Sequence, residues 1–403
     1  MVREVKGFIP QKIKNYAWHL PKAHIANLKY GFASKNMVVI GVTGTDGKTT
    51  TTNMIYQILK NAGKKVSMIS TINAVLGDEV LDTGFHITSP NPLDLQKYIK
   101  KAKVLGSEYL VLEVTSSGLD QFRVLGVKFS VGVITNITHD HLDYHKTWEN
   151  YFKAKAKLIK NVQTAVINRD EEHFNRLSKL TKGKVLSFGL HKNSNFNPLK
   201  FALKLKIPGD YNLLNGLAAA AVSVSLNIPS KIIKDTLNNF EALPGRMEEI
   251  KNDLGIKIIV DFAHTPNALE QALKTLKPKT KEKLISVFGC ASERDILKRP
   301  IMGGISARLA DITVLTDEDP RFEDRDKILD EIANGAFSHG AKLNENLFKE
   351  PDRQKAIKMA INLAKKGDIV AIFGKGHEKS MNYKGVEIPW SDQEAVKTAL
   401  KNG

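Results

Sequence analysis

The residues with the clearest chemistry lie directly after the apolar run 37–40. Glycines let backbone N–H groups close on phosphate oxygens, and a following helix N-terminus adds positive potential. Lys48 can neutralise outer phosphates, while the Thr49 hydroxyl can contact Mg²⁺. We therefore expect this loop to hold the phosphates of ATP. The expected phosphate contacts are Gly44, Thr45, Asp46, Gly47, Lys48, Thr49 and Thr50.

The glycine spacing sets this loop apart from the commonest phosphate loop. The common pattern has four residues between its first glycine and Gly-Lys. Here only Thr45 and Asp46 separate Gly44 from Gly47. An ordinary glycine-rich turn is the alternative, but the Lys-Thr pair in a strand-to-helix context disfavours it. The short spacing indicates a distinct branch of ATP-using proteins.

Two further segments carry potential metal ligands. Glu113 ends the apolar strand predicted over 109–114 and could hold Mg²⁺, although a solvent-exposed carboxylate is the alternative. Residues 135–145 follow another predicted strand and include three histidines. A zinc hydrolase is conceivable, but neither His-Glu-x-x-His nor Cys-x-x-Cys occurs. The upstream phosphate loop favours Mg²⁺ for ATP, with capping or core roles as the remaining alternative.

The elements that must position these residues alternate between short apolar strands and helical patterns. This rhythm predicts α/β domains, each with a mostly parallel sheet and helices on both faces. We expect a lead-in segment 1–36, a central domain 37–243, and a C-terminal domain 244–403 after the Pro-Gly linker. The predicted strands are 66–69, 109–114, 131–134 and 165–167, then 256–260, 284–288, 312–315 and 369–373.

The composition and net charge limit the classes of binding partner and the cellular location that we expect for this protein. The net charge of +17, from 60 basic and 43 acidic residues, favours acidic small molecules such as nucleotides. The lysines are dispersed rather than interleaved with stacking aromatics, which disfavours nucleic acid. A single cysteine, Cys290, fits a reducing, cytoplasmic location, and no apolar run reaches the length of a membrane span.

Residues 1–30 mix basic and aromatic side chains, and Pro10 and Pro21 are expected to break this segment. They are too polar for a secretory signal. We expect a solvated lead-in that packs on the first domain. Contact with a membrane surface is the alternative.

The motifs together resemble the Mur ligase family from about residue 37 to the C-terminus. The branch most similar is that of the UDP-N-acetylmuramoyl-tripeptide synthetases. The resemblance implies a P-loop-type central domain followed by a Rossmann-like C-terminal domain. The motifs that carry it are Gly44–Thr49, Leu112–Ser116, Asn136–Asp143, Tyr151–Lys155, Gly209–Asn215, Leu243–Met247, Val260–Pro266 and Gly374–Glu378.

This resemblance implies an ATP-dependent amide ligase of peptidoglycan biosynthesis. The carboxylate of a peptide acceptor attacks the γ-phosphate to form an acyl phosphate, and the amine of an amino acid then displaces phosphate. Lys48 is implied in catalysis, Thr49 and Glu113 at one Mg²⁺, and His141 at a second. Lys155 matches a lysine that CO₂ converts into a metal-binding carbamate in this family.

The same resemblance implies contacts to each substrate. Asn212 and Asn215 match residues near the adenine, and Arg246, Asp261 and His264 match nucleotide contacts beside a hinge at Leu243-Pro-Gly. The acceptor-binding positions implied are Thr88, Ser89, Thr115, Gln121 and Arg123. The amino-acid-binding positions implied are Asp319, Arg321, Gly374 and Glu378.

The identity of the amino acid depends mainly on Arg321 and Glu378. An arginine can grip a distal carboxylate in a bidentate way, and a glutamate can accept from a distal amine. This pairing favours meso-diaminopimelate over L-lysine, although Glu318-Asp319 replaces the Asp-Asn of diaminopimelate-using relatives. A solvent-facing arginine is the alternative.

The family's uridine-binding N-terminal domain has no room before the first strand. Three explanations are open: residues 1–36 form a reduced site, a separate uridine-binding protein supplies one, or the acceptor carries no UDP. Two other functions also remain, a related folate or poly-amino-acid ligase and a non-catalytic nucleotide-binding subunit of a complex.

Overall fold

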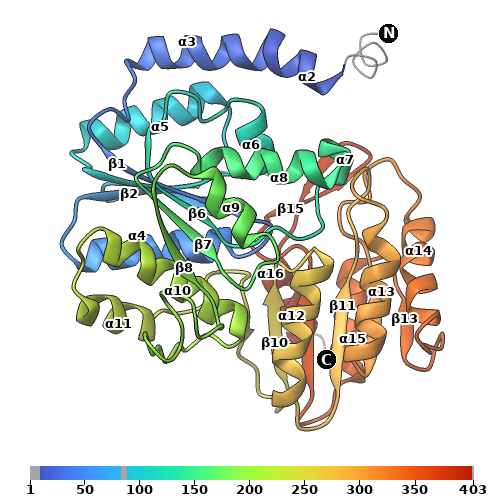
Figure 1. The fold of residues 1–403 in the computed structure, drawn as a ribbon. Helices are drawn as coiled ribbons and strands as arrows, with labels where there is room; N and C mark the ends of the chain where they lie inside the picture. The colour runs from blue at the N-terminus through green and yellow to red at the C-terminus, as the bar shows by residue number, and fades with distance from the viewer. Residues whose placement is uncertain (1–9, 83–88, 402–403) are drawn as a thin grey trace. The chain divides into compact units, whose positions relative to one another are not determined.

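The structure, a computed structural model, describes residues 10–82 and 89–401 and divides into two compact units. The first unit contains most of the chain up to residue 240, and Figure 1 shows its sheet with helices on both faces. The second unit contains residues 241–403 together with two short earlier segments, Thr138–Asp143 and Ile207–Asp210.

An eight-stranded sheet in the order β4-β3-β2-β5-β1-β6-β7-β8 forms the centre of the first unit. The hairpin β3–β4 pairs antiparallel at one edge, whereas the other strands run parallel. Their Val- and Ile-rich sequences suit a sheet that helices cover on both faces. The strands are β1 Val38–Thr43, β2 Val66–Ile69, β3 Asn73–Leu76, β4 Glu79–Asp82, β5 Tyr109–Glu113, β6 Phe129–Ile134, β7 Thr164–Asn168 and β8 Lys184–Phe188.

Helices α5 and α8 lie on one face of this sheet, and α4 and α11 lie on the other (Figure 1). Local signals fix several starts: Asn91 caps α5 directly before Pro92, and the Thr147 hydroxyl caps α8. The helices are α4 Lys48–Asn61, α5 Pro92–Val104, α6 Ser116–Asp120, α7 Leu142–His145, α8 Trp148–Ala156, α9 Phe174–Leu180, α10 Asp210–Ser225 and α11 Ser230–Asn238, with a 3₁₀ turn η2 Lys157–Ile159.

The lead-in is helical from residue 11 to residue 30. It comprises α2 Gln11–Lys14, the π-helical turn η1 Asn15–His19 and α3 Leu20–Tyr30. Pro21 lies in the first turn of α3 and does not end the helix, contrary to the interruption that its position suggests. A proline ring clashes with the carbonyl four residues earlier in a regular helix, and a wider π turn directly before it relieves that crowding.

The second unit is built around a six-stranded sheet in the order β13-β12-β11-β14-β10-β9. Only β9 pairs antiparallel, and a separate hairpin joins β15 and β16. The strands are β9 Glu248–Ile250, β10 Lys257–Asp261, β11 Leu284–Phe288, β12 Ile312–Leu315, β13 Leu347–Lys349, β14 Ile369–Phe373, β15 Ser380–Tyr383 and β16 Val386–Pro389. The helices are α12 Pro266–Leu276, α13 Lys298–Leu309, α14 Arg325–Phe337, α15 Arg353–Leu363 and α16 Asp392–Lys401, with a 3₁₀ turn η3 Lys277–Lys279.

The predicted α/β class with mostly parallel sheets is confirmed. Strands β2, β11, β12 and β14 have the predicted bounds, and the other predicted strands differ by one or two residues at their ends. The domain limits 1–36, 37–243 and 244–403 stay a prediction.

Candidate active site

The phosphate loop connects the C-terminal end of β1 to the first residue of α4. Lys48 turns back over the loop, and its Nζ donates to the carbonyl oxygens of Gly44, at 3.0 Å, and Thr45, at 2.7 Å. Gly47 precedes α4 with φ of +79°, a conformation that favours glycine. A buried helix N-terminus and a lysine thus face the place where the pattern predicts phosphate.

Two residues that follow β6 clamp this loop, and sequence reasoning did not assign them to it. The Asn136 side-chain oxygen accepts from the backbone N–H of Thr45, at 3.1 Å, and of Asp46, at 2.8 Å. The Thr135 hydroxyl donates to the Asp46 carbonyl at 2.6 Å. A Cβ on Gly44 would lie 1.7 Å from Thr135 Oγ1, so only glycine fits there. The sequence signal that could have indicated this role is the position of Thr135 and Asn136 directly after a predicted strand.

Thr49 and Glu113, the residues expected at one Mg²⁺, lie in contact. The Thr49 hydroxyl donates to Glu113 Oε1 at 3.0 Å, and the backbone N–H of Thr71 donates to the other carboxylate oxygen at 3.0 Å. Both side chains are buried. Hydroxyl and carboxylate oxygens are ligands that suit Mg²⁺. Across residues 10–82 and 89–401, no group of three or more His, Cys, Asp or Glu side chains is arranged to hold a metal ion.

Lys155 lies on α8 and is 1 % exposed, unlike an ordinary surface lysine. Its Nζ lies 4.6 Å from the centre of the Tyr151 ring. The Tyr151 hydroxyl in turn lies 2.9 Å from Thr45 Oγ1 in the phosphate loop. The fold therefore brings Lys155 close to the loop through one intervening aromatic residue.

The three histidines of the segment 135–145 have separate partners. His139 Nε2 lies 2.7 Å from Asp295, and His141 Nε2 lies 3.3 Å from Asp140; all of these residues belong to the second unit. His145 belongs to the first unit, where its Nε2 lies 3.0 Å from Ser116 Oγ.

Asn212 and Asn215, expected near the adenine, are buried on α10. Asn215 reaches the N-terminal turn of α4, where its Oδ1 accepts from the Thr51 hydroxyl at 3.2 Å. A Cβ on Gly47 would lie 2.3 Å from the same oxygen. The structure therefore brings Asn215 to the phosphate loop, and Asn212 lies next to Asn215 on the helix.

The described acceptor-binding candidates form one hydrogen-bonded group in the first unit. Arg123 donates to Gln121 Oε1, at 3.0 and 2.7 Å, and to the Ser89 carbonyl, at 2.6 Å. The Thr115 hydroxyl donates to Ser89 Oγ at 3.2 Å. Burial lowers the pKa of Arg123 from its ordinary value. Thr88 lies outside the described residues.

The N-terminal helix contacts the segment that carries this group. Asn15 Nδ2 donates to Asp120 Oδ2 at 2.6 Å, and the same oxygen accepts from the Tyr144 hydroxyl at 3.2 Å. Lys157 Nζ lies 2.8 Å from the other Asp120 oxygen. Burial opposes ionisation of Asp120, but these donors outweigh it and lower its pKa.

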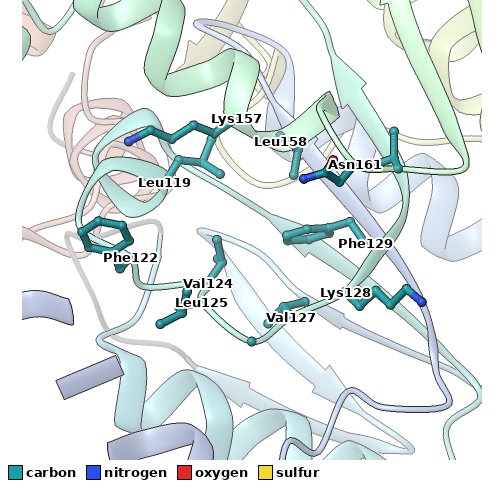
Figure 2. A pocket seen from close by; sticks show the side chains of 12 residues that line it. Leu119, Phe122, Val124, Leu125, Val127, Lys128, Phe129, Lys157, Leu158 and Asn161 are labelled. Atoms are coloured by element: carbon teal, nitrogen blue, oxygen red, sulfur yellow. The ribbon is translucent and has the colours of Figure 1, made fainter. Parts of the chain in front are cut away.

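A pocket of about 480 Å³ lies beside the same segment (Figure 2). Its walls are mainly apolar, including Phe122, Leu125 and Phe129, with Lys128, Lys157 and Asn161 among its lining residues. Phe129 is the first residue of β6, whereas the phosphate loop follows the last residue of the neighbouring parallel strand β1. The pocket therefore lies at the N-terminal end of these parallel strands, whereas the phosphate loop lies at their C-terminal end.

The nucleotide-binding candidates of the second unit lie around Asp261 at the end of β10. The Asp261 carboxylate accepts from the backbone N–H groups of Met247 and Ala263 at 2.7 and 2.8 Å. Arg246 lies over the Phe262 ring at 4.5 Å. Burial lowers the pKa of His264 to about 3, so its imidazole is neutral at pH 7.

Lys298 bonds to His264, and its charge acts on Asp140 within the second unit. Lys298 Nζ donates to the His264 carbonyl at 2.7 Å. Burial opposes ionisation of Asp140, but the charges of His141 and Lys298 outweigh it and hold its pKa well below its usual range. Lys298 was not among the predicted site residues, and its charge is what the buried Asp140 requires.

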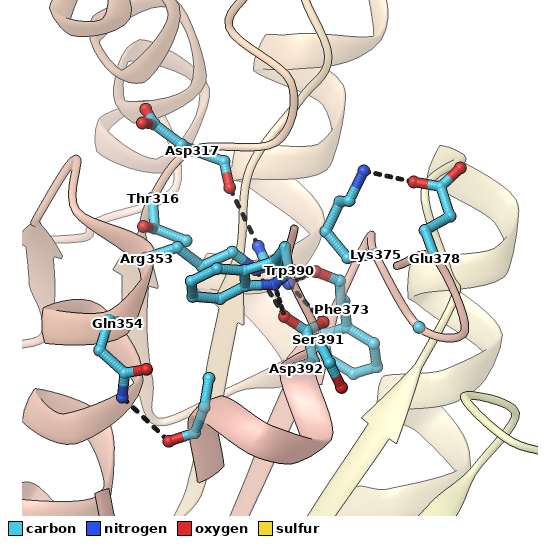
Figure 3. Close-up of polar contacts among 12 residues, drawn as sticks. Thr316, Asp317, Arg353, Gln354, Phe373, Lys375, Glu378, Trp390, Ser391 and Asp392 are labelled. Atoms are coloured by element: carbon cyan, nitrogen blue, oxygen red, sulfur yellow. Dashed lines mark hydrogen bonds and ion pairs between the residues drawn. The ribbon is translucent and has the colours of Figure 1, made fainter. Parts of the chain in front are cut away.

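Two of the amino-acid-binding candidates, Asp319 and Glu378, contact Lys375, which is fully buried. Lys375 Nζ lies 3.0 Å from Asp319 Oδ1 and forms an ion pair with Glu378, shown in Figure 3. Asp319 Oδ1 also accepts from the backbone N–H of Asn382 at 2.9 Å, and the Arg321 N–H donates to the Asn382 carbonyl. Asp319 and Arg321 both have φ of +46°. All of these residues belong to the second unit, where the Arg321 guanidinium lies 3.7 Å from Glu293. Lys375 was missed as the shared partner of Asp319 and Glu378.

Glu318 and Arg353 complete this charged region. Glu318 is buried against Gly374, where a Cβ would lie 2.3 Å from Glu318 Oε2. Burial raises the pKa of Glu318 to about 7. Arg353 forms a bidentate pair with Asp392, at 2.7 and 2.8 Å, and both side chains are 0 % exposed (Figure 3).

Comparison with known proteins adds independent findings. Residues 42–223 match the Mur ligase middle domain, and residues 245–376 match the Mur ligase, glutamate ligase domain. No helix in the described part of the chain is long and apolar enough to cross a membrane.

Two curated relatives and one solved structure are similar to nearly the whole chain. The UDP-N-acetylmuramoyl-L-alanyl-D-glutamate–2,6-diaminopimelate ligase of Clostridium botulinum is 38% identical over 92% of this chain and 80% of its own. The UDP-N-acetylmuramyl-tripeptide synthetase of a Roseiflexus species is 33% identical over 94% of this chain and 81% of its own. A solved structure of a UDP-N-acetylmuramoyl-L-alanyl-D-glutamate–2,6-diaminopimelate ligase is 30% identical to this chain. It has a TM-score of 0.61 and covers 91% of this chain and 79% of its own.

The motif order, the two α/β units and these relatives agree. The chain belongs to the Mur ligase family of ATP-dependent amide ligases.

Proposed function

We propose that this protein adds meso-diaminopimelate to a muramoyl-dipeptide-type cell-wall precursor, with ATP as the energy source, as a member of the tripeptide synthetase branch. The observation that carries the proposal is the cluster of Asp319, Lys375 and Glu378 in the second unit, with Arg321 two residues after Asp319. It offers both signs of charge, as a substrate with a distal amine and a distal carboxylate requires. Relatives 38% and 39% identical are named diaminopimelate ligases.

The phosphate loop supports the first chemical step. Lys48 and the N-terminus of α4 stabilise the phosphates, and the rigid loop aligns the γ-phosphate with the acceptor carboxylate. Thr49 and Glu113 would hold Mg²⁺, which supplies charge neutralisation for phosphoryl transfer. Arg123 and Gln121 orient the acceptor, since their side chains already form one group with Ser89.

The second step requires the free amine of the amino acid at the acyl phosphate. Glu378 accepts from the distal amine and Arg321 contacts the distal carboxylate, so the reacting amine stays available. Arg246, Asp261, His264, Asn212 and Asn215 are proposed as nucleotide contacts. No side chain needs to form a covalent intermediate, and binding and orientation supply the catalysis.

Lys155 is proposed to carry a CO₂-derived carbamate, with His141 at a second metal ion. Burial supports this assignment, because a buried ammonium is costly and a carbamate converts the amine into a metal ligand. Lys155→Ala should abolish ligation and remove the carbamate signal in ¹³C NMR of protein equilibrated with ¹³CO₂. Lys153→Ala is the matched control, since Lys153 is an exposed lysine on the same helix. A carbamate signal that persists in Lys155→Ala would contradict the assignment.

The deciding experiment measures ADP release and product mass with meso-diaminopimelate or L-lysine as the amino acid. We expect turnover with diaminopimelate, and a large rise in its KM in Arg321→Gln. Arg308→Gln, a change of an exposed arginine of the same unit, should leave this KM unchanged. Turnover of lysine with no use of diaminopimelate would overturn the proposed substrate.

Recognition of the sugar nucleotide, the cytoplasmic location and the domain limits stay predictions. UDP-linked and UDP-free muramoyl dipeptides should be compared as acceptors. Preference for the UDP-free form would favour an acceptor without uridine. Activity on the UDP-linked form alone would favour a uridine site in residues 1–36 or on a separate uridine-binding protein.

A further inference from the structure

The helical lead-in Gln11–Tyr30 has an inner face that is fixed to the first unit. On this face Ala23, Ala26 and Asn27 are buried. Asn27 Nδ2 donates to the Leu125 carbonyl at 2.8 Å, and a Cβ on Gly126 would lie 2.0 Å from Asn27 Oδ1. This close packing fixes which side of the helix faces outward.

The outward side of the helix is apolar. Trp18, Ile25 and Leu28 are 61%, 58% and 72% exposed. Pro21, Ile25 and Leu28 have the spacing that places side chains on one side of an α-helix, and Trp18 precedes them by one turn. Exposed apolar side chains are ordinary when scattered, but a stripe along one helix indicates a binding surface.

The charges around this stripe all have one sign. Residues 10–37 contain Lys12, Lys14, Lys22, Lys29 and Lys35 and no aspartate or glutamate. Lys22 and Lys29 are exposed beside the stripe, and Lys22 Nζ lies 4.2 Å from the centre of the Trp18 ring. Asp120 bonds to the lead-in through Asn15, which is buried. The outward face is therefore both apolar and cationic.

This combination selects one kind of partner. The buried centre of a protein–protein interface is depleted in lysine. Helices that lie in a membrane interface carry apolar side chains, with tryptophan among them, flanked by lysines that reach anionic headgroups. We propose that the outward face of residues 11–35 binds the surface of an anionic lipid membrane. This inference does not depend on which amino acid the enzyme adds.

The test is sedimentation of the full chain with vesicles of phosphatidylcholine alone or mixed with phosphatidylglycerol. We expect binding to the mixed vesicles that weakens as salt is raised, and little binding to phosphatidylcholine. Ile25→Gln/Leu28→Gln and Lys22→Gln/Lys29→Gln should each reduce the affinity by about tenfold or more. Circular dichroism and ligase activity without vesicles should match those of the unchanged protein.

Matched controls make the result specific. Leu199→Gln changes another highly exposed leucine, and Lys179→Gln/Lys192→Gln changes two exposed lysines, all in the same unit. These variants should bind vesicles like the unchanged protein. The proposal is overturned if mixed vesicles do not bind, or if the helix variants bind as well as the controls do. Self-association without lipid that the helix variants abolish would also overturn it, because the face would then bind a second copy.

Discussion

In the first unit the phosphate loop is packed so tightly that its glycines have no space for a side chain. In the second unit the cluster around Lys375 is held by buried charges. Gly44 and Gly47 lie against Thr135 and Asn215, and the loop's hydrogen bonds are mainly to backbone groups. Lys375, by contrast, lies between two carboxylates. The loop should therefore be sensitive to added volume and insensitive to pH, whereas the charged region should be sensitive to pH and to the loss of a charged partner.

The largest effect is expected from Gly44→Ala. The added methyl would lie 1.7 Å from Thr135 Oγ1, so the loop must move. Displacement of a positioning group by about 1 Å costs on the order of 100-fold in rate, and we expect at least that loss in kcat/KM for ATP. Gly106→Ala is the control for a backbone cost without a clash, because Gly106 has φ of +83° and nothing lies within 4 Å of its Cβ position. ATP affinity by calorimetry and ADP release should both fall in the first variant alone. Unchanged ATP affinity would contradict the steric account.

The second-largest effect tests the charged region. Arg353→Met leaves Asp392 buried without its bidentate partner, which should cost about 3–5 kcal/mol of unfolding free energy. Adding Asp392→Leu should recover much of this loss, because no unpaired charge then remains. Urea denaturation of both variants measures the effect. If the single variant is as stable as the double variant, buried charge does not hold this region together.

A smaller effect, with a pH signature, is expected from Glu318→Gln. Burial raises the pKa of Glu318 to about 7 from 4.5, so folding favours the protonated form. The stabilisation is complete below pH 4.5 and is lost as the pH rises through 7, a change of about 3 kcal/mol. The Gln variant should lack this dependence and be more stable than the unchanged protein at pH 8. Glu345→Gln, at an exposed position, should behave like the unchanged protein, as measured by urea denaturation at pH 5 and pH 8. If the unfolding free energy of the two variants depends on pH in the same way, the pKa of Glu318 is not raised by burial.

The smallest effect is expected near the acceptor-binding candidates of the first unit. Both neutral and charge-assisted hydrogen bonds hold this region together. Asn15→Ala removes the bond to Asp120 and should raise the KM for the acceptor by about threefold to tenfold, with kcat unchanged. Gln11→Ala removes only the outer bond to Asn15 and should have little effect. Steady-state kinetics with varied acceptor decide between the two. A fall in kcat without a change in KM would instead indicate disturbed folding.

The strands and the phosphate loop were predictable because their signals are local. A continuous apolar run such as 284–288 specifies a buried strand by itself, and Gly44 and Lys48 lie close together in sequence. The strands that were missed are β3, β4, β8, β9, β13, β15 and β16. Strands of three to five residues depend on neighbouring strands for pairing, so their composition alone is a weak signal.

The partners of the candidate residues could not be predicted for a different reason. Lys375 meets Asp319 from a position 56 residues away, and Asn136 meets Asp46 from 90 residues away. Only the sheet order brings such segments together. The helical lead-in was also missed, because Pro21 suggests a break that the π turn before it removes.

The interleaving of the two units has a consequence for how the chain can be divided. Thr138–Asp143 and Ile207–Asp210 belong to the second unit, although residues of the first unit flank them on both sides. A fragment that starts at residue 241 would lack Asp140, whose carboxylate interacts with the charge of Lys298. Separate expression of the C-terminal region should therefore give a product that proteases degrade more readily than the intact chain. Limited proteolysis of the intact protein should accordingly release no stable C-terminal piece.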